Sequence, residues 1–362
     1  MRTKLKGLKK DAQMTDKKFF TKELLKWNKY DNARVMPWKY EKDPYKIWIS
    51  EIILQQTKVE QGLEYYNRFI KKYPSVKKIA KAQESEVFKL WEGLGYYTRC
   101  KNIIASSKFI HEKLDGKFPQ NYEDILQLKG VGSYTASAIA SFAYNLPYAV
   151  LDGNVFRVLS RYFGIKTPID IPLGKIFYNI LANELLDKKF PGIYNQSIMD
   201  FGATICKPLP ICKICPLNSR CVAYLNDLIN VLPVKEKRII KRTRWLYYLV
   251  VENKGNFYVR KRTGKDIWQN LYEFILIETP KPITIKKLIT SEKFRSIFNL
   301  TEFTIQSISQ LNKQQLTHQT INGQFINISI KTLLDINDHE LVSKRRLKKL
   351  PFPKFITTYL KD

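Results

Sequence analysis

The chain has 362 residues, which is enough for two domains with separate hydrophobic cores. Lys and Arg number 62 against 33 Asp and Glu, and the net charge of +29 favours a polyanionic partner, nucleic acid before an anionic membrane surface. A lysine-rich compositional bias is the alternative explanation. No apolar run approaches the roughly 20 residues that cross a bilayer, and the N-terminus lacks the apolar segment of a signal peptide. We therefore expect a soluble intracellular protein, in which residues 1–18 form a basic tail.

The first predicted domain is all-α and covers residues 15–228, where apolar residues recur at helical spacing. Asp43 is a capping residue followed by a proline, a pattern that begins a helix. Thr57–Glu60 fits a capping box, so a second helix should begin there and end before Pro74. The break between these helices falls at Gln55-Gln56. Further helices are predicted over residues 87–92, 97–114, 122–128, 134–144, 155–162, 175–186 and 194–205.

Residues 229–243 contain a proline and several basic side chains, and we interpret them as a linker between domains. Beyond the linker the pattern changes to β-rich segments, which predicts a smaller α+β domain over residues 244–353. That domain should end near Phe352, before a short basic tail. Its predicted strands cover residues 245–251 and 257–262, on either side of a turn at 253–256, and residues 274–277 and 325–330.

Four of the five cysteines lie within sixteen residues, in the pattern C-x5-C-x2-C-x5-C. Such clustering indicates a metal or cluster site in a reducing compartment rather than a disulfide framework. The thiolates can hold an iron–sulfur cubane or, less readily, a structural zinc, because zinc ribbons usually carry two separated C-x2-C pairs. Chance clustering is the third alternative. Basic side chains nearby could meet phosphates, and a structural role is favoured over a redox one. The cysteines are Cys206, Cys212, Cys215 and Cys221, and the basic residues are Lys207, Lys213 and Arg220.

A glycine-rich turn, Gly130-Val131-Gly132, joins two predicted helices. Glycine lets the backbone turn tightly, and the free N–H groups at the start of the next helix can bind a phosphate oxygen. Taken alone, the segment is equally consistent with an ordinary turn between helices. The charge of the chain and the cysteine cluster that follows favour the phosphate-binding interpretation.

Two acidic residues suit the hydrolysis of an N-glycosidic bond. Glu51 lies in the apolar run Ile47–Leu54, where burial would raise its pKa and keep it protonated. Asp152 occupies a predicted helix N-cap, which favours the carboxylate. The reaction needs one acid to protonate the departing base and one anion to stabilise the cationic sugar, with water as the nucleophile. The alternatives are a chance acid in an apolar stretch and a plain helix cap.

The order of motifs along the chain resembles that of the MutY-type adenine DNA glycosylases, which belong to the helix-hairpin-helix superfamily. The match covers nearly the whole chain, and so many motifs in one order are highly specific. They are the four cysteines, Met36-Pro37-Trp38, Ser50–Thr57, Trp91–Tyr97, Gly130-Val131-Gly132 and Leu151–Val158.

The resemblance implies a base excision repair enzyme that flips adenine out of double-stranded DNA and removes it where it is mispaired with 8-oxoguanine or guanine. Glu51 would protonate the adenine, and Asp152 would stabilise the oxocarbenium-like sugar. Tyr134 and Asn154 would line the site. The cysteines would hold a [4Fe–4S] cluster. The resemblance further implies a monomer in the cytoplasm, associated with the nucleoid.

The resemblance also implies which residues recognise the mispair. Gln56 and Tyr96 would intrude into the duplex where the adenine leaves the stack. The second domain resembles the nudix-like C-terminal module of the family through Trp268–Phe274, and its Thr317 and His318 would inspect 8-oxoguanine. The acidic nudix box that binds magnesium is absent from this sequence, so we expect no nucleotide hydrolysis.

Two other functions compete with this one. The first is a thymine or oxidised-pyrimidine glycosylase of the endonuclease III type, whose bifunctional members carry a lysine at the position of Tyr134. Without that amine no Schiff base forms, and we expect hydrolysis with at most weak strand cleavage. The second is a non-catalytic iron–sulfur DNA-binding protein, against which the two acids argue. The sequence departs from the family pattern in the first cysteine spacing, x5 where x6 is common, in Lys39 for arginine and in Thr317 for serine.

Overall fold

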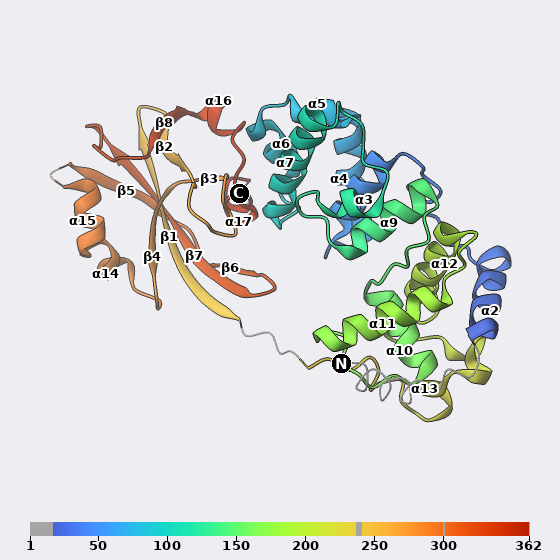
Figure 1. Ribbon diagram of the computed structural model, residues 1–362. Coiled ribbons are helices and arrows are strands. Elements are labelled where there is room, and N and C mark those ends of the chain that lie inside the picture. The colour runs from blue at the N-terminus through green and yellow to red at the C-terminus, as the bar shows by residue number, and fades with distance from the viewer. Residues whose placement is uncertain (1–16, 237–240, 300, 362) are drawn as a thin grey trace. The chain divides into compact units, whose positions relative to one another are not determined.

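The computed structural model describes residues 17–236, 241–299 and 301–361 (Figure 1). Part of the predicted basic tail, with Lys4, Lys6, Lys9 and Lys10, and residues 237–240 of the predicted linker lie outside these ranges. The chain divides into two compact units. Residues up to Ala80 and from Ala105 to the linker form the helical unit, and Lys81–Ile104 joins the C-terminal residues in the sheet unit. The boundaries that we predicted for the two domains stay a prediction.

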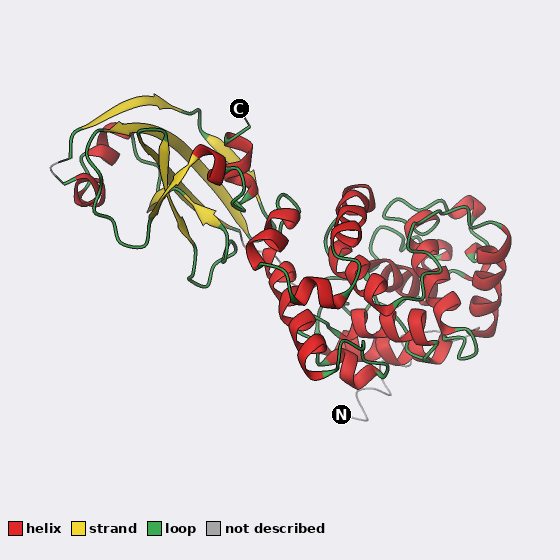
Figure 2. Cartoon of the chain, turned by 90° about the horizontal axis from the view of Figure 1, so that it is seen from above, coloured by secondary structure: helices red, strands yellow, loops and turns green. Residues whose placement is uncertain are grey.

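Every regular element described in the helical unit is a helix, as the sequence predicted (Figure 2). The further helices predicted between residues 87 and 205 all occur, with ends that differ by a few residues. Within the described ranges, no helix is long and apolar enough to cross a membrane. Two helices do not lie wholly in this unit: α6 (Glu84–Trp91) belongs to the sheet unit, and α7 (Tyr97–Lys113) spans the division between the units. The helices of the helical unit are α2 (Lys17–Tyr30), α3 (Pro44–Leu54), α4 (Val59–Lys72), α5 (Val76–Ala80), α8 (Tyr122–Leu126), α9 (Ser133–Tyr144), α10 (Gly153–Phe163), α11 (Pro172–Leu185), α12 (Pro191–Thr204), η1 (Cys212–Ile214), η2 (Asn218–Arg220) and α13 (Val222–Leu225).

The starts of α3 and α4 show which local signals act. Asp43 caps α3 as predicted, and its side chain accepts a backbone N–H of the first turn at 2.9 Å. The capping box predicted at Thr57 is wrong, because Lys58 is the cap of α4 and makes no side-chain capping bond. The Thr57 hydroxyl donates instead to the Gln55 carbonyl at 3.4 Å, inside the turn between the helices. The helix ends at Lys72, before the proline that was predicted to stop it.

The core of the helical unit forms where α10 and α12 pack against each other, with α2 and α11 beside them. Trp27 of α2 meets Phe201 of α12 edge to face, with ring centroids 5.0 Å apart. A second packed pair, α3 and α9, carries Glu51 and Tyr134. The packing of these two pairs therefore brings the predicted site residues of α3, α9 and α10 into one part of the fold.

The sheet unit is built on an eight-stranded sheet with the order β3-β2-β1-β7-β5. β4 pairs with β1, β6 with β7 and β8 with β2, and only β1 and β7 are parallel among the described pairs. The four predicted strands correspond to β1, β2, β4 and β7. The strands are β1 (Arg242–Asn253), β2 (Asn256–Lys261), β3 (Tyr272–Glu273), β4 (Ile275–Thr279), β5 (Phe303–Ile308), β6 (Asn312–Gln315), β7 (Gln319–Ile330) and β8 (Glu340–Ser343), and the helices are α14 (Ile285–Ile289), α15 (Glu292–Phe298), α16 (Lys344–Leu347) and α17 (Lys354–Tyr359).

Strand β1 is buried on both faces. Tyr247 and its neighbours on one face pack with side chains of α14 and α15. On the other face Tyr248 stacks on Phe325 of β7 with centroids 5.3 Å apart, and Phe355 of α17 stacks on Phe325 at 5.7 Å. Because both faces of β1 are buried, its sequence is a continuous apolar run rather than an alternation of apolar and polar residues.

Part of the sheet unit gave no signal that we recognised. Strand β6 is polar throughout, and β5 is largely exposed with an apolar alternation that ends at Ile305, where the pairing has a bulge. Residues after Phe352 form α17 rather than the short tail that we expected, because Phe355 and Ile356 pack into the unit. Lys89 of α6 also belongs here, since its ammonium donates to the Leu350 carbonyl at 3.0 Å.

Candidate active site

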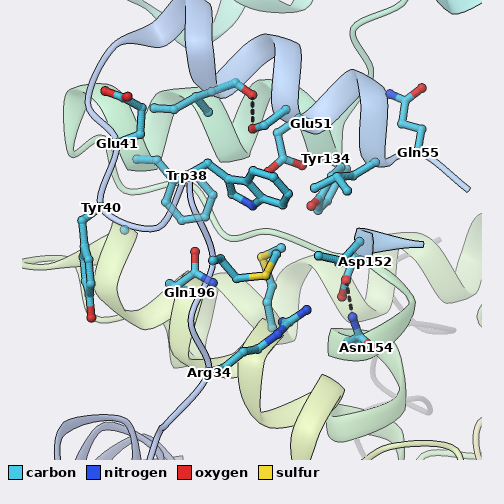
Figure 3. Close-up of a pocket in the computed structure, with 18 of the residues that line it drawn as sticks. Arg34, Trp38, Tyr40, Glu41, Glu51, Gln55, Tyr134, Asp152, Asn154 and Gln196 are labelled. Atoms are coloured by element: carbon cyan, nitrogen blue, oxygen red, sulfur yellow. Dashed lines mark hydrogen bonds between the residues drawn. The ribbon is translucent and has the colours of Figure 1, made fainter. Parts of the chain in front are cut away.

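One cavity in the helical unit gathers most of the catalytic residues predicted from the sequence (Figure 3). Its volume is about 530 Å³, within the range of small-molecule sites. The walls come from the segment 34–42, from α3 and the turn after it, from the starts of α9 and α10, and from α12. The predicted site residues that line it are Glu51, Gln56, Tyr134, Asp152 and Asn154.

Glu51 lies on α3, and only 6% of it is exposed. Each residue from Ile47 to Ile53 in this helix is buried, so the burial predicted from the apolar run is confirmed. Burial raises the pKa of Glu51 to about 7, while a hydrogen bond from Tyr134 lowers it and the charge of Asp152 raises it further. Near neutral pH the carboxyl group therefore carries its proton in a large share of the molecules.

Tyr134 projects from the first turn of α9. Because α9 packs against α3, its hydroxyl reaches Glu51 and donates a hydrogen bond to it. Burial, and then the charges of Glu51 and Asp152, raise the pKa of Tyr134 well above its ordinary value. The phenol therefore keeps its proton and gives the site a hydrogen-bond donor, but no amine.

The turn before α9 exposes backbone N–H groups. Gly130 has a φ of 80°, which side chains rarely allow, and Gly132 caps α9 without a side-chain bond. Both glycines are exposed, and Val131 between them is buried. A Cβ added at Gly132 would meet no atom within 4 Å, so packing within the chain does not require glycine there. The open N-terminus of α9 thus leaves space for an anion.

Asp152 caps α10, as predicted. One carboxylate oxygen accepts the Val155 N–H at 2.7 Å, and the other accepts the Asn154 side-chain amide at 2.8 Å. The capping position alone predicts a lowered pKa. Burial outweighs these hydrogen bonds and the charge of Arg157, so the pKa of Asp152 is raised. The cap is confirmed and favours the carboxylate as expected, while burial, which the local sequence does not indicate, sets the net direction of the pKa shift.

Arg157, one turn further along α10, orients Asn154. Its guanidinium donates to the Asn154 side-chain oxygen at 2.7 Å, which leaves the amide nitrogen for Asp152. The same guanidinium donates to the carbonyls of Gly202 and Cys206, each at 2.7 Å. A chain of hydrogen bonds therefore joins the backbone of the first clustered cysteine to the aspartate. Arg157 stood in a recognised motif, but its role was not predicted.

Other polar residues of the site were missed by sequence reasoning. Arg34 and Gln196 line the cavity, and both bind Asp200, a fully buried carboxylate on α12. Figure 3 shows Trp38 in the cavity between Gln196 and Glu51. The i,i+4 spacing of Gln196 and Asp200 was a signal that could have paired them, because such residues are neighbours on a helix.

Gln56 and Tyr96, the two residues expected to enter the duplex, share an uncommon backbone conformation. Their φ angles are 55° and 48°, in a region that non-glycine residues rarely adopt. Both residues are exposed, Tyr96 by 43%. Gln56 borders the cavity of the helical unit, whereas Tyr96 belongs to the sheet unit. Each side chain thus stands at the tip of a sharply turned segment.

Thr317 and His318 form the tip of the hairpin between β6 and β7. The Leu316 N–H donates to the Gln319 carbonyl at 2.7 Å and closes the turn. His318 is exposed, and the Thr317 hydroxyl lies 2.5 Å from the Tyr96 hydroxyl. Within the sheet unit, the structure therefore brings together a residue expected to enter the duplex and one expected to inspect 8-oxoguanine.

The four clustered cysteines gather after α12 and around η1 and η2. Their sulfurs lie close enough for their charges to act on one another. Burial raises the pKa of Cys215 to about 12 and that of Cys221 to about 11. Across the residues that the structure describes, no three Cys, His, Asp or Glu side chains converge as a single bound metal ion requires. Cys206 follows α12, Cys212 begins η1, Cys215 follows η1 and Cys221 caps α13.

The donors around these sulfurs suit thiolates. Arg161 of α10 donates to the Cys206 sulfur at 3.8 Å, and the Leu217 N–H donates to Cys215. A cubane distributes its four thiolates over different irons, so its ligands need not converge on one point, and their sulfurs accept hydrogen bonds of this kind. The residues present are therefore compatible with a cluster held by the four thiolates.

Two family models match the chain. The model of the HhH-GPD superfamily of base excision DNA repair proteins matches residues 49–173, and the model of the NUDIX domain matches residues 246–362. Together with the cavity and its two acids, these matches define a base excision DNA repair glycosylase that carries a nudix-like domain.

Named relatives narrow that class. The adenine DNA glycosylase of Buchnera aphidicola subsp. Baizongia pistaciae (strain Bp) is 36% identical over 83% of this chain and 84% of its own length. The protein of that name from Mus musculus is 39% identical over 59% of this chain and 43% of its own length. The chain belongs to the adenine DNA glycosylase family.

Solved structures share the helical fold. A thermostable thymine-DNA glycosylase is 31% identical with a TM-score of 0.54, over 58% of this chain and 96% of that one. A non-covalent complex of endonuclease III with DNA is 21% identical with a TM-score of 0.51, over 59% of this chain and 99% of that one. The fold therefore occurs both in a glycosylase named for thymine and in a protein named as an endonuclease, so the base must be argued from the site.

Proposed function

We propose that this protein flips adenine out of double-stranded DNA and hydrolyses its N-glycosidic bond where the adenine is mispaired with 8-oxoguanine or guanine. The reaction is a step of base excision repair. The observation that carries the proposal is the single cavity lined by Glu51 and Asp152, two carboxyl groups in different surroundings. The named relatives support adenine as the base, and the geometry supports a division of labour between the acids.

Glu51 acts as the acid and Asp152 as the anion. Tyr134 donates one hydrogen bond to Glu51, whereas Asp152 accepts from Val155 and Asn154. Hydrogen bonds to a carboxylate stabilise its charged form, so the proton resides on Glu51 and the negative charge on Asp152. Glu51 protonates the departing adenine, and Asp152 stabilises the positive charge that develops on the sugar while water attacks.

Tyr134 limits the chemistry to hydrolysis. A bifunctional glycosylase forms a Schiff base between an amine and the sugar, and a phenol cannot form that bond. The hydroxyl donates to Glu51 instead. We therefore infer a monofunctional glycosylase with at most weak strand cleavage.

Contacts outside the cavity hold the DNA and read the mispair. The open N–H groups at Gly130–Gly132 bind a phosphate, supported by the net charge of +29. Gln56 and Tyr96, each on its own unit, are residues that enter the duplex. Thr317 and His318 supply donors and acceptors to 8-oxoguanine. One chain contains every group that the reaction needs, so it acts as a monomer, on nucleoid DNA in the cytoplasm.

The four cysteines bind a [4Fe–4S] cluster that stabilises the loop from Cys206 to Cys221. Bound iron takes the place of the thiol protons that burial favours, and the loop presents Lys207 and Lys213 to phosphates. Protein purified without oxygen should contain about four irons per chain. Stoichiometric zinc without iron would contradict the cluster and leave the proposed reaction standing.

Single-turnover excision tests the proposed function directly. Duplexes carrying A:8-oxoguanine, A:G or G:T, each labelled in the strand to be cut, separate the candidate activities. Adenine should be released from the first two duplexes, and strand breakage should require added alkali. Release of thymine from G:T in place of adenine would favour the activity for which the thymine-DNA glycosylase structure is named. Binding without release of any base would make the protein a non-catalytic DNA-binding protein.

A further inference from the structure

A carboxylate behind the cavity wall accepts hydrogen bonds at both of its oxygens. Asp200 on α12 has no exposed surface. One oxygen accepts from Arg34 at 2.9 Å and from the Gln196 side-chain amide at 2.8 Å. The other accepts from Asn32 at 3.0 Å and faces the Lys39 ammonium at 3.1 Å. Arg34 and Lys39 are cations paired with this carboxyl group, so both of its oxygens face donors and the group is held in one orientation.

This arrangement determines which way the Gln196 amide points. Both oxygens of Asp200 accept hydrogen bonds, and the Gln196 amide nitrogen is one of the donors, so the amide oxygen must face elsewhere. Gln196 lines the cavity, and Figure 3 shows its oxygen on the side of Trp38. At this place the cavity therefore presents a hydrogen-bond acceptor, while the donor end of the amide is occupied by Asp200.

We propose that Asp200 is a positioning residue that makes the site select adenine over guanine and hypoxanthine, by holding the Gln196 amide in this orientation. The proposal rests on the proposed function. The major-groove edge of adenine carries an acceptor, N7, beside a donor, the N6 amino group. Protonated Glu51 donates to the first, and the Gln196 oxygen accepts from the second. The two side chains of one cavity are thus complementary to that edge.

The same edge of guanine or hypoxanthine is not complementary. Both bases carry an oxygen where adenine has its amino group, so the Gln196 oxygen would face a second acceptor. Two buried acceptors without a proton between them are costly. The distinction matters on an A:G mispair, because a site that took either purine would remove bases from both strands.

The test compares the single-turnover rates of adenine and hypoxanthine excision, each opposite 8-oxoguanine, as a ratio. Asp200→Asn supplies an amide that can donate to the Gln196 oxygen, so that the Gln196 nitrogen turns into the cavity. The ratio of the adenine rate to the hypoxanthine rate should fall about ten- to a hundredfold. Equal changes in the two rates would show that Asp200 only supports the cavity wall, and would overturn the proposal.

A second variant covers the case in which Asp200→Asn does not fold. Gln196→Met leaves the ion pairs of Asp200 with Arg34 and Lys39 in place. It should lower the same ratio about tenfold or more. Adenine loses the Gln196 oxygen that accepts from its amino group, and hypoxanthine no longer meets that oxygen with its own. In the combined variant Asp200→Asn should lower the ratio no further, since the amide through which it acts is gone. A further fall, or an unchanged ratio in Gln196→Met, would overturn the proposal.

The unsubstituted chain separates this proposal from the proposed function. If it releases adenine and neither variant changes the ratio, the role of Asp200 fails and the glycosylase stands. If it releases neither base from any duplex, the proposed function fails and the role of Asp200 fails with it.

Discussion

The cavity of the helical unit and the β6–β7 turn of the sheet unit place polar side chains in opposite surroundings. In the cavity, Glu51 is buried and Asp152 accepts two hydrogen bonds from its own helix start. At the turn, His318 is exposed. Thr317 is half-buried, and its hydroxyl contacts the Tyr96 hydroxyl of the same unit. A carboxyl group whose pKa must be shifted needs burial, whereas a side chain that reads a base in another molecule must be reachable by that molecule.

The two regions therefore depend on the fold to different degrees. The cavity exists only when α3, α9, α10 and α12 are packed together, and a buried carboxyl group reduces the stability of that packing. The turn needs only the pairing of β6 with β7, through register pairs such as Gln315 with Thr320. Substitutions in the cavity should thus change chemistry and stability together, and substitutions at the turn should change discrimination alone.

The largest effect is expected for Asp152→Asn. The amide keeps the cap of α10, since Asn caps as well as Asp, but cannot stabilise a cationic sugar. Single-turnover excision of adenine should fall about a hundred- to a thousandfold, with DNA affinity retained. Asp43→Asn, at the cap of α3, is the matched control and should leave the rate unchanged. Near-normal excision by Asp152→Asn would contradict the assignment of Asp152 as the catalytic anion.

Glu51→Gln should raise the free energy of unfolding at neutral and alkaline pH, but not at acidic pH. The unfolded chain releases this proton near pH 4.5 and the folded chain near 7, so folding loses stability as pH rises between these values. The rise in pKa from 4.5 to about 7 corresponds to about 3 kcal/mol. Urea unfolding of both proteins at pH 5 and pH 8 measures the difference, which should be small at pH 5 and largest at pH 8. The exposed Glu60→Gln is the control, and an equal offset at both pH values would contradict the prediction.

Replacing Thr317 and His318 together with alanine should reduce discrimination without affecting the acids. Excision of adenine opposite guanine should change little, while the advantage of 8-oxoguanine should shrink about ten- to a hundredfold. Rates on the two duplexes, measured with unchanged thermal stability, give this ratio. Equal losses on both duplexes would mean that the turn only supports the sheet unit, and an unchanged preference would locate damage recognition elsewhere.

The smallest expected effect is the change in the excision rate over one pH unit above pH 7. Because burial raises the pKa of Glu51 to about 7, the acid form that protonates adenine is depleted above that pH. The single-turnover rate should fall about tenfold for each pH unit above 7. The same measurement on the turn variant should give the same profile, because Thr317 and His318 take no part in proton transfer. A rate that rises between pH 7 and pH 9 would exclude Glu51 as the acid.

Local patterns predicted the elements that local interactions form. The helices from α3 to α12 follow apolar spacing, and α3 and α10 also begin at predicted capping residues, signals that act within about one turn of the residue concerned. Strand β6 was missed because it is polar, β5 because its apolar alternation is interrupted after Ile305, and α17 because Phe355 is held by residues far away in the sequence. The burial of Glu51 was predictable, since its whole helix is apolar.

The sequence by itself determined the family motifs, the helical and sheet-forming parts of the chain, and the burial of Glu51. Only the tertiary structure decided the surroundings of those groups. Asp152 sits at a cap that favours its charge, yet burial by other elements raises its pKa. Asp200 meets Arg34 and Asn32 across more than 160 residues, a contact that no spacing indicates. Burial and charge depend on distance in space, whereas sequence patterns report neighbours along the chain.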